Sequence, residues 1–339
     1  MTRVTNANEK FRDTLAGKNA LITGGLGFIG SNLAFRLVDL GVRVTLVDSL
    51  VPAYGGNMFN IRGLEDRVAI NIADVRDPHS MAHLVKGRDL IFNLAGQVSH
   101  IDSMEDPFTD LEINVRAQVS VLEACRRNNR DVKIVYSSTR QLYGKPEYLP
   151  VDEKHIAHPT DVNGINNLAG ELYHILYNDV YGVRAVSLRL TNTYGPRQLV
   201  KHSRQGLMGR FIRQIVEGEE IELYGDGKQV RDFNFVDDVV EAMLLAAITE
   251  SANGQIFNLG GDERVSLRQL VETMIEISGK GGYRLVPFPP EIKRIDIGDY
   301  YGDYTKARNE LGWQPAISLR DGLTTTINYY KENLARYLT

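Results

Sequence analysis

Three glycines, Gly24, Gly27 and Gly30, follow a short apolar run and precede a helical pattern. Glycine at the first position permits a tight turn, and at the second it lets the backbone approach a ligand closely. The third lets the helix pack against the preceding strand, so that the helix N-terminus points its free N–H groups at a bound anion. Such a unit is typical of a pyrophosphate site, although a glycine triplet alone also fits an ordinary turn.

A carboxylate, Asp48, closes the next predicted strand about 20 residues further on, where it can bind the ribose hydroxyls of a dinucleotide. No basic residue follows it directly, which favours NAD over NADP. Further residues after the third and fourth predicted strands are expected to border the adenine and the nicotinamide, with ordinary loop chemistry as the alternative; they are Asp74, Val75, Leu94, Ala95 and Gly96.

The elements that must position these residues alternate between short aliphatic runs and longer amphipathic patterns. Alternation of this kind predicts βαβ units and a Rossmann-type, doubly wound parallel sheet with helices on both faces. The predicted strands are 19–23, 42–48, 67–72, 90–94, 132–137 and 185–190. The predicted helices are 28–40, 105–129, 162–181, 236–248, 267–278 and 319–334.

The rhythm becomes irregular after Tyr194-Gly195-Pro196. We therefore expect an α/β protein with an NAD-binding Rossmann domain over 1–190, which also receives part of 236–260. A smaller, discontinuous, mixed α/β substrate domain is expected over 191–339. Ligands of open α/β sheets bind beyond the C-terminal ends of the strands, so the site is predicted in the cleft between the two domains.

Composition narrows the possible functions. The 339 residues are 43% hydrophobic with a net charge of −4, which gives no sign of a nucleic-acid surface. A single cysteine, Cys125, lies in an apolar-periodic run and is expected to be a buried thiol, and no cluster has metal-ligand spacing. Neither a secretion signal nor a run of about 20 apolar residues is found, so a cytoplasmic protein without a membrane partner is expected.

Beyond these single features, a series of ordered motifs resembles the extended short-chain dehydrogenase/reductases, the family of nucleotide-sugar epimerases and dehydratases. The motifs are Thr23-Gly-Gly-Leu-Gly-Phe-Ile-Gly30, Asn93-Leu-Ala-Gly96, Ser137-Ser-Thr-Arg-Gln-Leu-Tyr-Gly144, Leu188-Arg-Leu-Thr-Asn-Thr-Tyr-Gly-Pro-Arg197 and Arg231-Asp-Phe-Asn-Phe-Val-Asp-Asp238. The resemblance implies an NAD cofactor, a nucleotide-diphosphate sugar as ligand, and a homodimer formed through the helices over 105–129 and 162–181. It also implies that Phe28, Ile29 and Asn114 border the cofactor.

For the substrate, the resemblance implies that Thr139 holds the reacting sugar hydroxyl. It further implies a set of sugar or diphosphate contacts, for which ordinary caps, ion pairs and surface charge are the alternatives; they are Ser103, Asn192, Arg231, Lys293 and Arg294. Where the family's dehydratases and decarboxylases carry acidic residues after this threonine, the chain has Arg140 and Gln141. Glutamine cannot shuttle a proton, which argues against both chemistries.

The family's catalytic tyrosine and lysine lie four residues apart on one helix, ahead of a Leu-Ala-Gly-Glu motif. Aligning on Leu168-Ala-Gly-Glu171 places Asn163 and Asn167 at those two positions. Asparagine forms hydrogen bonds but does not titrate near neutral pH. Three explanations stay open: another base, with His100 and Tyr143 as candidates, a protein that binds without turnover, or engineered substitutions. The leading prediction is a nucleotide-sugar 4-epimerase with an altered proton shuttle.

Overall fold

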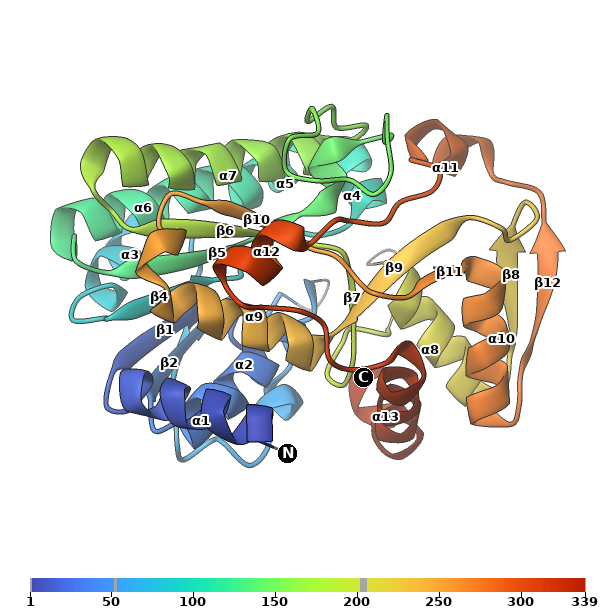
Figure 1. Ribbon diagram of the computed structural model, residues 1–339, viewed down its shortest axis with the longest axis horizontal. Helices are drawn as coiled ribbons and strands as arrows, with labels where there is room; N and C mark the ends of the chain where they lie inside the picture. Colours follow the sequence, from blue (N-terminus) through green and yellow to red (C-terminus); the bar gives the residue numbers. More distant parts are fainter. Residues whose placement is uncertain (1, 52–53, 202–205, 339) are drawn as a thin grey trace.

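A seven-stranded sheet and a smaller C-terminal region lie side by side in the computed structural model, which describes residues 2–51, 54–201 and 206–338 (Figure 1). Every strand pairing in the large sheet is parallel, in the order β10-β6-β5-β4-β1-β2-β3. The strands are β1 (Asn19–Thr23), β2 (Arg43–Asp48), β3 (Ala69–Ile72), β4 (Leu90–Asn93), β5 (Lys133–Thr139), β6 (Ala185–Leu190) and β10 (Ile256–Leu259). This is the doubly wound Rossmann topology that the alternating pattern predicts.

The order of the strands creates one crevice. β1 lies between β2 and β4, so the chain turns to opposite sides of the sheet on either side of β1. In register, Thr23 pairs with Asn93, and Asn93 with Tyr136, so that these strands end close to one another. Loops that leave neighbouring strands in opposite directions leave a ligand-binding crevice at the C-terminal edge.

Helices cover both faces of this sheet because successive side chains of a buried strand point to opposite sides. In β1, Ala20 and Ile22 belong to one apolar cluster and Leu21 to another. One face carries α1 (Thr2–Leu15), α2 (Phe28–Asp39) and α9 (Val236–Ile248). The other carries α3 (Pro78–Leu84), α4 (His100–Glu105), α5 (Pro107–Leu111), α6 (Ala117–Asn128) and α7 (Val162–Tyr181).

The helix predicted over 105–129 is present, but it starts at Pro107 and runs to Asn128 through one π-helical turn. Asp106 ends α4, and its side chain then caps α5 by accepting a hydrogen bond from Thr109 N at 3.1 Å. Pro107 suits the first position of the new helix, where no backbone N–H is needed. A π-helical turn, η3 (Glu112–Arg116), follows before α6 and directs Asn114 inward. Short 3₁₀ turns elsewhere are η2 (Met58–Ile61), η4 (Arg140–Tyr143) and η5 (Glu250–Ala252).

The C-terminal region has two small sheets around a separate apolar core. In one sheet β9 pairs parallel with β7 and antiparallel with β11, while in the other β8 and β12 run parallel. The strands are β7 (Asn192–Tyr194), β8 (Glu220–Tyr224), β9 (Val230–Phe235), β11 (Arg264–Ser266) and β12 (Gly282–Val286). The helices are α8 (Leu207–Glu217), α10 (Leu267–Ser278), α11 (Pro290–Ile295), α12 (Thr305–Glu310), α13 (Leu319–Asn333) and α14 (Ala335–Leu338).

Later segments return to the large sheet. β10 forms its edge by pairing with β6, and Trp313 packs in the core beneath α9. The Trp313 indole N–H donates to Asp238 O at 2.8 Å, which joins the segment after α12 to α9. Among the described residues, no helix is both long and apolar enough to cross a membrane.

Candidate functional site

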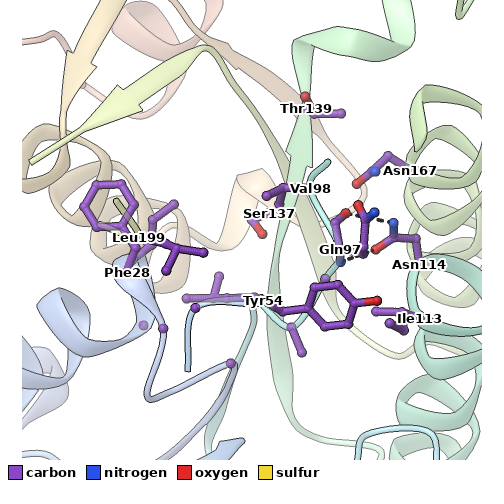
Figure 2. Close-up of a pocket in the computed structure, with 18 of the residues that line it drawn as sticks. Phe28, Tyr54, Gln97, Val98, Ile113, Asn114, Ser137, Thr139, Asn167 and Leu199 are labelled. Atoms are coloured by element: carbon purple, nitrogen blue, oxygen red, sulfur yellow. Dashed lines mark hydrogen bonds between the residues drawn. The ribbon is translucent and has the colours of Figure 1, made fainter. Parts of the chain in front are cut away.

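A cavity of about 620 Å³ opens at the C-terminal edge of the large sheet and reaches the C-terminal region (Figure 2). In this view Phe28 and Leu199 lie on one side, and Asn114 and Asn167 lie on the other. The lining includes most residues that the sequence predicts for the site, namely Gly24, Gly27, Phe28, Ile29, Gly30, Asp48, Asp74, Val75, Leu94, Ala95, Gly96, Asn114, Thr139, Asn163, Asn167 and Asn192. The structure therefore brings these residues together, while their roles stay predictions.

The glycine turn has the geometry that a dinucleotide needs. Gly24 has a φ of +66°, and a side chain there would meet the backbone of Ala95 at 3.1 Å. A side chain on Gly30 would collide with the carbonyl oxygen of Gly24, so the close approach of α2 to the turn requires glycine. Gly27 is the N-cap of α2, and no side chain caps it. The N-terminus of α2 is thus directed at the cavity with its N–H groups available for a pyrophosphate.

Two carboxylates mark the far end of the cavity from Thr139. Asp48 accepts from Leu26 N at 3.0 Å and Leu50 N at 2.9 Å, and burial raises its pKa. Asp74 is held by Arg76, whose Nε and Nη2 donate to its oxygens at 2.6–3.0 Å. These hydrogen bonds lower the pKa of Asp74. Asp48 therefore retains lone pairs for ribose hydroxyls, and Asp74 neutralises the nearby guanidinium.

A buried polar network fixes the ends of β1 and β4. Thr23 Oγ1 donates to Asn93 Oδ1 at 2.8 Å and accepts from Leu94 N and Ala95 N at 3.0 and 3.2 Å. Asn93 Nδ2 lies 3.2 Å from His174 Nε2. Burial lowers the pKa of His174 to about 4, so its ring is neutral and can accept this bond. The network holds the segment beside the glycine turn in one conformation.

The two asparagines on α7 form part of the cavity wall. Asn163 is buried, and its Nδ2 donates to Gln97 O at 2.7 Å and Asp110 Oδ2 at 3.0 Å. Asn167 Nδ2 donates to Asn163 O at 2.9 Å and lies 3.2 Å from its Oδ1. Both N–H groups of Asn163 are therefore engaged within the protein, and neither asparagine can take up a proton near neutral pH.

The carboxylate of Asp110 explains why amide side chains are favourable in this part of the cavity wall. Its buried carboxylate accepts hydrogen bonds from three amides, those of Asn114, Asn163 and Asn166, at 2.8–3.1 Å. A buried carboxylate without a cation needs several such donors. Replacing Asn163 would remove one of the three.

Thr139, the last residue of β5, lies next to a pair of titratable groups. Its Oγ1 accepts from Gln141 N at 3.2 Å, which leaves its hydroxyl hydrogen free to donate elsewhere. Gln141 Nε2 donates to Asp161 Oδ2 at 2.8 Å. The same carboxylate oxygen lies 3.0 Å from Nδ1 of His100, a residue that also lines the cavity.

The His100–Asp161 pair has the asymmetry of a base and the group that orients it. The His100 side chain is 37% exposed, whereas that of Asp161 is fully buried. Burial disfavours the charged carboxylate, but His100 and the donors Gly164 N and Gln141 outweigh it, so the pKa of Asp161 is lowered. Although the two side chains are 3.0 Å apart, Nδ1 of His100 is buried and is not aligned for a hydrogen bond with any described group.

Tyr143, the other candidate base, lies outside the cavity lining. Its hydroxyl donates to Asn258 Oδ1 at 2.8 Å and accepts from Arg189, and burial raises its pKa to about 12. A phenol held in this way cannot act as a base near neutral pH. Cys125 is buried as predicted, and burial raises its pKa to about 12, so it is no nucleophile.

Four predicted substrate contacts also lie outside the lining. The Ser103 hydroxyl donates to His100 O at 2.8 Å and accepts from Asn163 N, which joins α4 to α7. The Arg231 guanidinium is directed to the carbonyls of Val230 and Gly298 and lies 3.9 Å from Asp296. Lys293 and Arg294 are exposed on α11. Their predicted roles have no support from this geometry.

Several lining residues were not predicted from the sequence. They include Tyr54, Arg76, Gln97 and Leu199. Gln97 directly follows the predicted Leu94-Ala-Gly96 segment, and its O and N both bond to the Asn114 amide. The sequence signal that could have identified Gln97 as a lining residue is its position directly after a predicted strand. Among the residues described, no three His, Cys, Asp or Glu side chains converge as a metal site.

A Rossmann sheet, a glycine turn at an uncapped helix and a long cleft define a dinucleotide-binding protein with room for a second ligand. A family model described as GDP-mannose 4,6 dehydratase matches residues 21–326. The chain belongs to this family of NAD-dependent nucleotide-sugar epimerases and dehydratases, the extended short-chain dehydrogenase/reductases.

Its relatives carry more than one activity in their names. The UDP-glucose 4-epimerase of Mycolicibacterium smegmatis is 32% identical over 315 residues, 92% of this chain and 98% of the relative. A structure of UDP-glucose 4-epimerase from Thermotoga maritima with UDP-glucose is 32% identical with a TM-score of 0.84, covering 93% and 99% of the two chains. A double mutant of the dTDP-glucose 4,6-dehydratase of Streptomyces venezuelae, solved with NAD, is 28% identical with a TM-score of 0.84, covering 93% and 98% of the two chains.

Proposed function

We propose that this protein is an NAD-dependent nucleotide-sugar epimerase that inverts C4 of a hexose through a 4-keto sugar, with a histidine in place of the tyrosine base. The observation that carries the proposal is the cavity lined by the glycine turn, Thr139 and His100, with Asp161 behind His100 at 3.0 Å. The chemistry that NAD supplies when bound is uptake of hydride from C4 and its return to the opposite face.

The residues at the glycine turn fit this cofactor. The N-terminus of α2, capped by no side chain, would hold the pyrophosphate, and Asp48 would accept the ribose hydroxyls. The Thr139 hydroxyl would donate to the reacting sugar hydroxyl, since its own acceptor position is already used by Gln141 N. Correct placement of this hydroxyl accounts for a large part of the rate enhancement, because the reacting atoms must approach within about 3–3.5 Å.

His100 would move the proton. Its Nε2 would accept the proton of the C4 hydroxyl as the ketone forms, and would return that proton when the hydroxyl is restored. Asp161, 3.0 Å from Nδ1, would stabilise the imidazolium and hold the ring in the tautomer whose Nε2 is free. Asn163 and Asn167 would form the wall and take no part in proton transfer.

The test is an NMR time course of the purified protein with NAD and a panel of nucleotide sugars. A C4 epimer is expected to appear, and His100→Gln is expected to slow its formation by about 10²–10⁴-fold, the usual contribution of acid–base catalysis. Efficient conversion without bound NAD would contradict the proposed function. A His100→Gln variant that works at the wild-type rate would contradict the proposed base.

A second candidate is a protein that binds NAD and a nucleotide sugar without turnover. It is favoured by the side-chain amide of Asn163, because both of its N–H groups donate to residues of the protein and none is left to act on a sugar. In that case saturation-transfer NMR would report binding while no sugar changes. If instead a Thr139→Val variant still binds NAD and the nucleotide sugar but no longer converts the sugar, the protein is an enzyme. A dehydratase or decarboxylase is disfavoured because Gln141, bonded to Asp161, cannot titrate.

We also propose that the protein is a homodimer formed through α7 and its neighbours. Apolar side chains recur along one side of α7, with Ile165, Leu172, Leu176 and Val180 between 47% and 61% exposed. Phe108 of α5 is 76% exposed beside the same group of helices. A contiguous apolar helix face on a surface is typical of a protein interface.

A further inference from the structure

Arg140 is a cation with an unused donor in the described part of the cavity wall. Arg140 directly follows Thr139 and lines the cavity. Its Nη2 donates to Asn192 Oδ1 at 3.1 Å, and its guanidinium carbon lies 4.8 Å from the centre of the Tyr300 ring. Its Nη1 is buried and has no hydrogen-bond partner within the described parts of the chain.

Acidic groups near Arg140 are already occupied by other donors. Asp232 and Asp161 act on the guanidinium through space, but neither forms an ion pair with it in the described structure. The oxygens of Asp232 accept from the Thr191 hydroxyl, Gly261 N and Gly302 N. Those of Asp161 accept from Gly164 N and Gln141 and face His100.

A second guanidinium adds to the positive charge. Burial and then repulsion from Arg140 lower the pKa of Arg231 to about 10. Arg231 is directed at backbone carbonyls and lies 3.9 Å from Asp296, so Asp296 is the carboxylate nearest to Arg231 and not a partner of Arg140. The carboxylates around Arg140 are therefore bonded to other donors, and one N–H group of its guanidinium has no acceptor among the described residues.

A buried guanidinium with an N–H group that lacks an acceptor is unfavourable, and an incoming anion would remove that cost. A guanidinium presents parallel N–H groups that match a carboxylate or a phosphate, whereas a neutral hexose offers only hydroxyl oxygens. Because Arg140 is the chain neighbour of Thr139, the proposed contact of the sugar hydroxyl, the anion is expected on the hexose. We propose that Arg140 binds a hexose carboxylate, so that the substrate is a nucleotide-linked uronic acid. The inference rests on the proposed function and names its substrate class.

The test is calorimetric titration of the full-length, NAD-loaded protein with UDP-glucuronate, UDP-glucose and UDP. The wild type is expected to bind UDP-glucuronate about 10- to 100-fold more tightly than UDP-glucose, the usual effect of a hydrogen-bonded charge. Arg140→Met is expected to lose that preference while its affinity for UDP-glucose stays within about twofold. Arg140→Lys, which keeps the positive charge but not the parallel N–H groups of the guanidinium, should retain part of the preference for UDP-glucuronate. Arg320→Met, on an exposed ion pair with Glu276, is the matched control.

The outcomes separate this inference from the proposed function. A wild type that binds neither UDP sugar nor any other member of the nucleotide-sugar panel refutes the proposed function, whereas equal affinity for UDP-glucuronate and UDP-glucose overturns the carboxylate site alone. Equal weakening of all three ligands, UDP included, by Arg140→Met would assign the guanidinium to the diphosphate and also overturn it. Without ligand, Arg140→Met should melt at or above the wild-type temperature, because an unpaired buried cation is removed. A clearly lower melting temperature of Arg140→Met would show that the guanidinium has a stabilising partner in the free protein, and would contradict the inference.

Discussion

Replacing Asp161 with asparagine changes one atom of the pair that we assign to proton transfer. The Oδ1 of Asp161 accepts from Gly164 N at 2.7 Å and caps α7, and an asparagine oxygen can keep that bond. The asparagine amide would then occupy the place of Oδ2, where Gln141 Nε2 lies at 2.8 Å and His100 Nδ1 at 3.0 Å. Two N–H donors, Gln141 Nε2 and His100 Nδ1, would therefore face the N–H groups of the new amide.

The expected effects on stability and on rate differ in size. Gln141 can turn its amide to offer oxygen, so the free energy of unfolding should fall by only about 1–2 kcal/mol. His100 can accept from the new amide only at Nδ1, which leaves its proton on Nε2 and blocks uptake of the substrate proton. Loss of acid–base catalysis lowers kcat by about 10²–10⁴-fold, equivalent to about 3–5 kcal/mol in the barrier. The variant should be folded and nearly inactive.

The assay is the NMR rate of epimer formation at saturating NAD and sugar, with the melting temperature measured in parallel. Substrate affinity should change little, because Asp161 does not line the cavity. Asp238→Asn is the matched control, since Asp238 is a buried carboxylate bonded to Ala316 N and Ile317 N away from the site. A kcat within about threefold of wild type would refute the assignment of His100 and Asp161 to general acid–base catalysis.

Three further expectations concern stability and assembly. Burial lowers the pKa of His174 from 6.5 to about 4, so the unfolded chain binds more protons between these values. Stability should be full above pH 6.5 and fall by about 3 kcal/mol as the pH drops toward 4, and urea unfolding should find this slope absent in His174→Phe. Burial likewise lowers the pKa of Lys133 to about 8, so the wild type should gain about 2 kcal/mol relative to Lys133→Met between about pH 7.5 and 10; a pH-independent difference in urea unfolding would contradict this. Val180→Asp should convert a dimer to a monomer in light scattering, whereas Ile72→Asp, equally exposed but elsewhere, should not; an unchanged mass for Val180→Asp would exclude that face.

Elements with local boundary signals were predictable from the sequence. The helix over 162–181 begins and ends where it was predicted, because Asp161 caps its first turn and Gly182 takes the left-handed conformation at its end. The predicted glycine turn lies between β1 and α2 for similar reasons: its backbone geometry depends on the residues themselves. The family resemblance then supplied Thr139, which the structure places beside the cavity.

Features that depend on distant partners were not predictable. α1 is mostly polar in sequence, and only its packing against α9 buries Phe11 and Leu15. The proximity of His100 to Asp161 joins the first residue of α4 to the N-cap of α7, from another part of the chain. The orientation of Arg231 toward Gly298 likewise depends on a segment that folds against β9 much later in sequence. Periodicity contains no information about such pairs.

The position of β10 in the large sheet has a consequence for synthesis and for engineering. During translation, residues 1–190 emerge first, but the edge of β6 stays uncovered until residues 256–259 follow. The core on that side also takes Phe257, Leu259 and Trp313 from later segments. A fragment that stops near residue 190 would expose this apolar surface and an unpaired strand edge, which promote aggregation. Chimeras that exchange substrate regions between relatives should therefore keep 236–259 and the segment around Trp313 with the nucleotide-binding sheet.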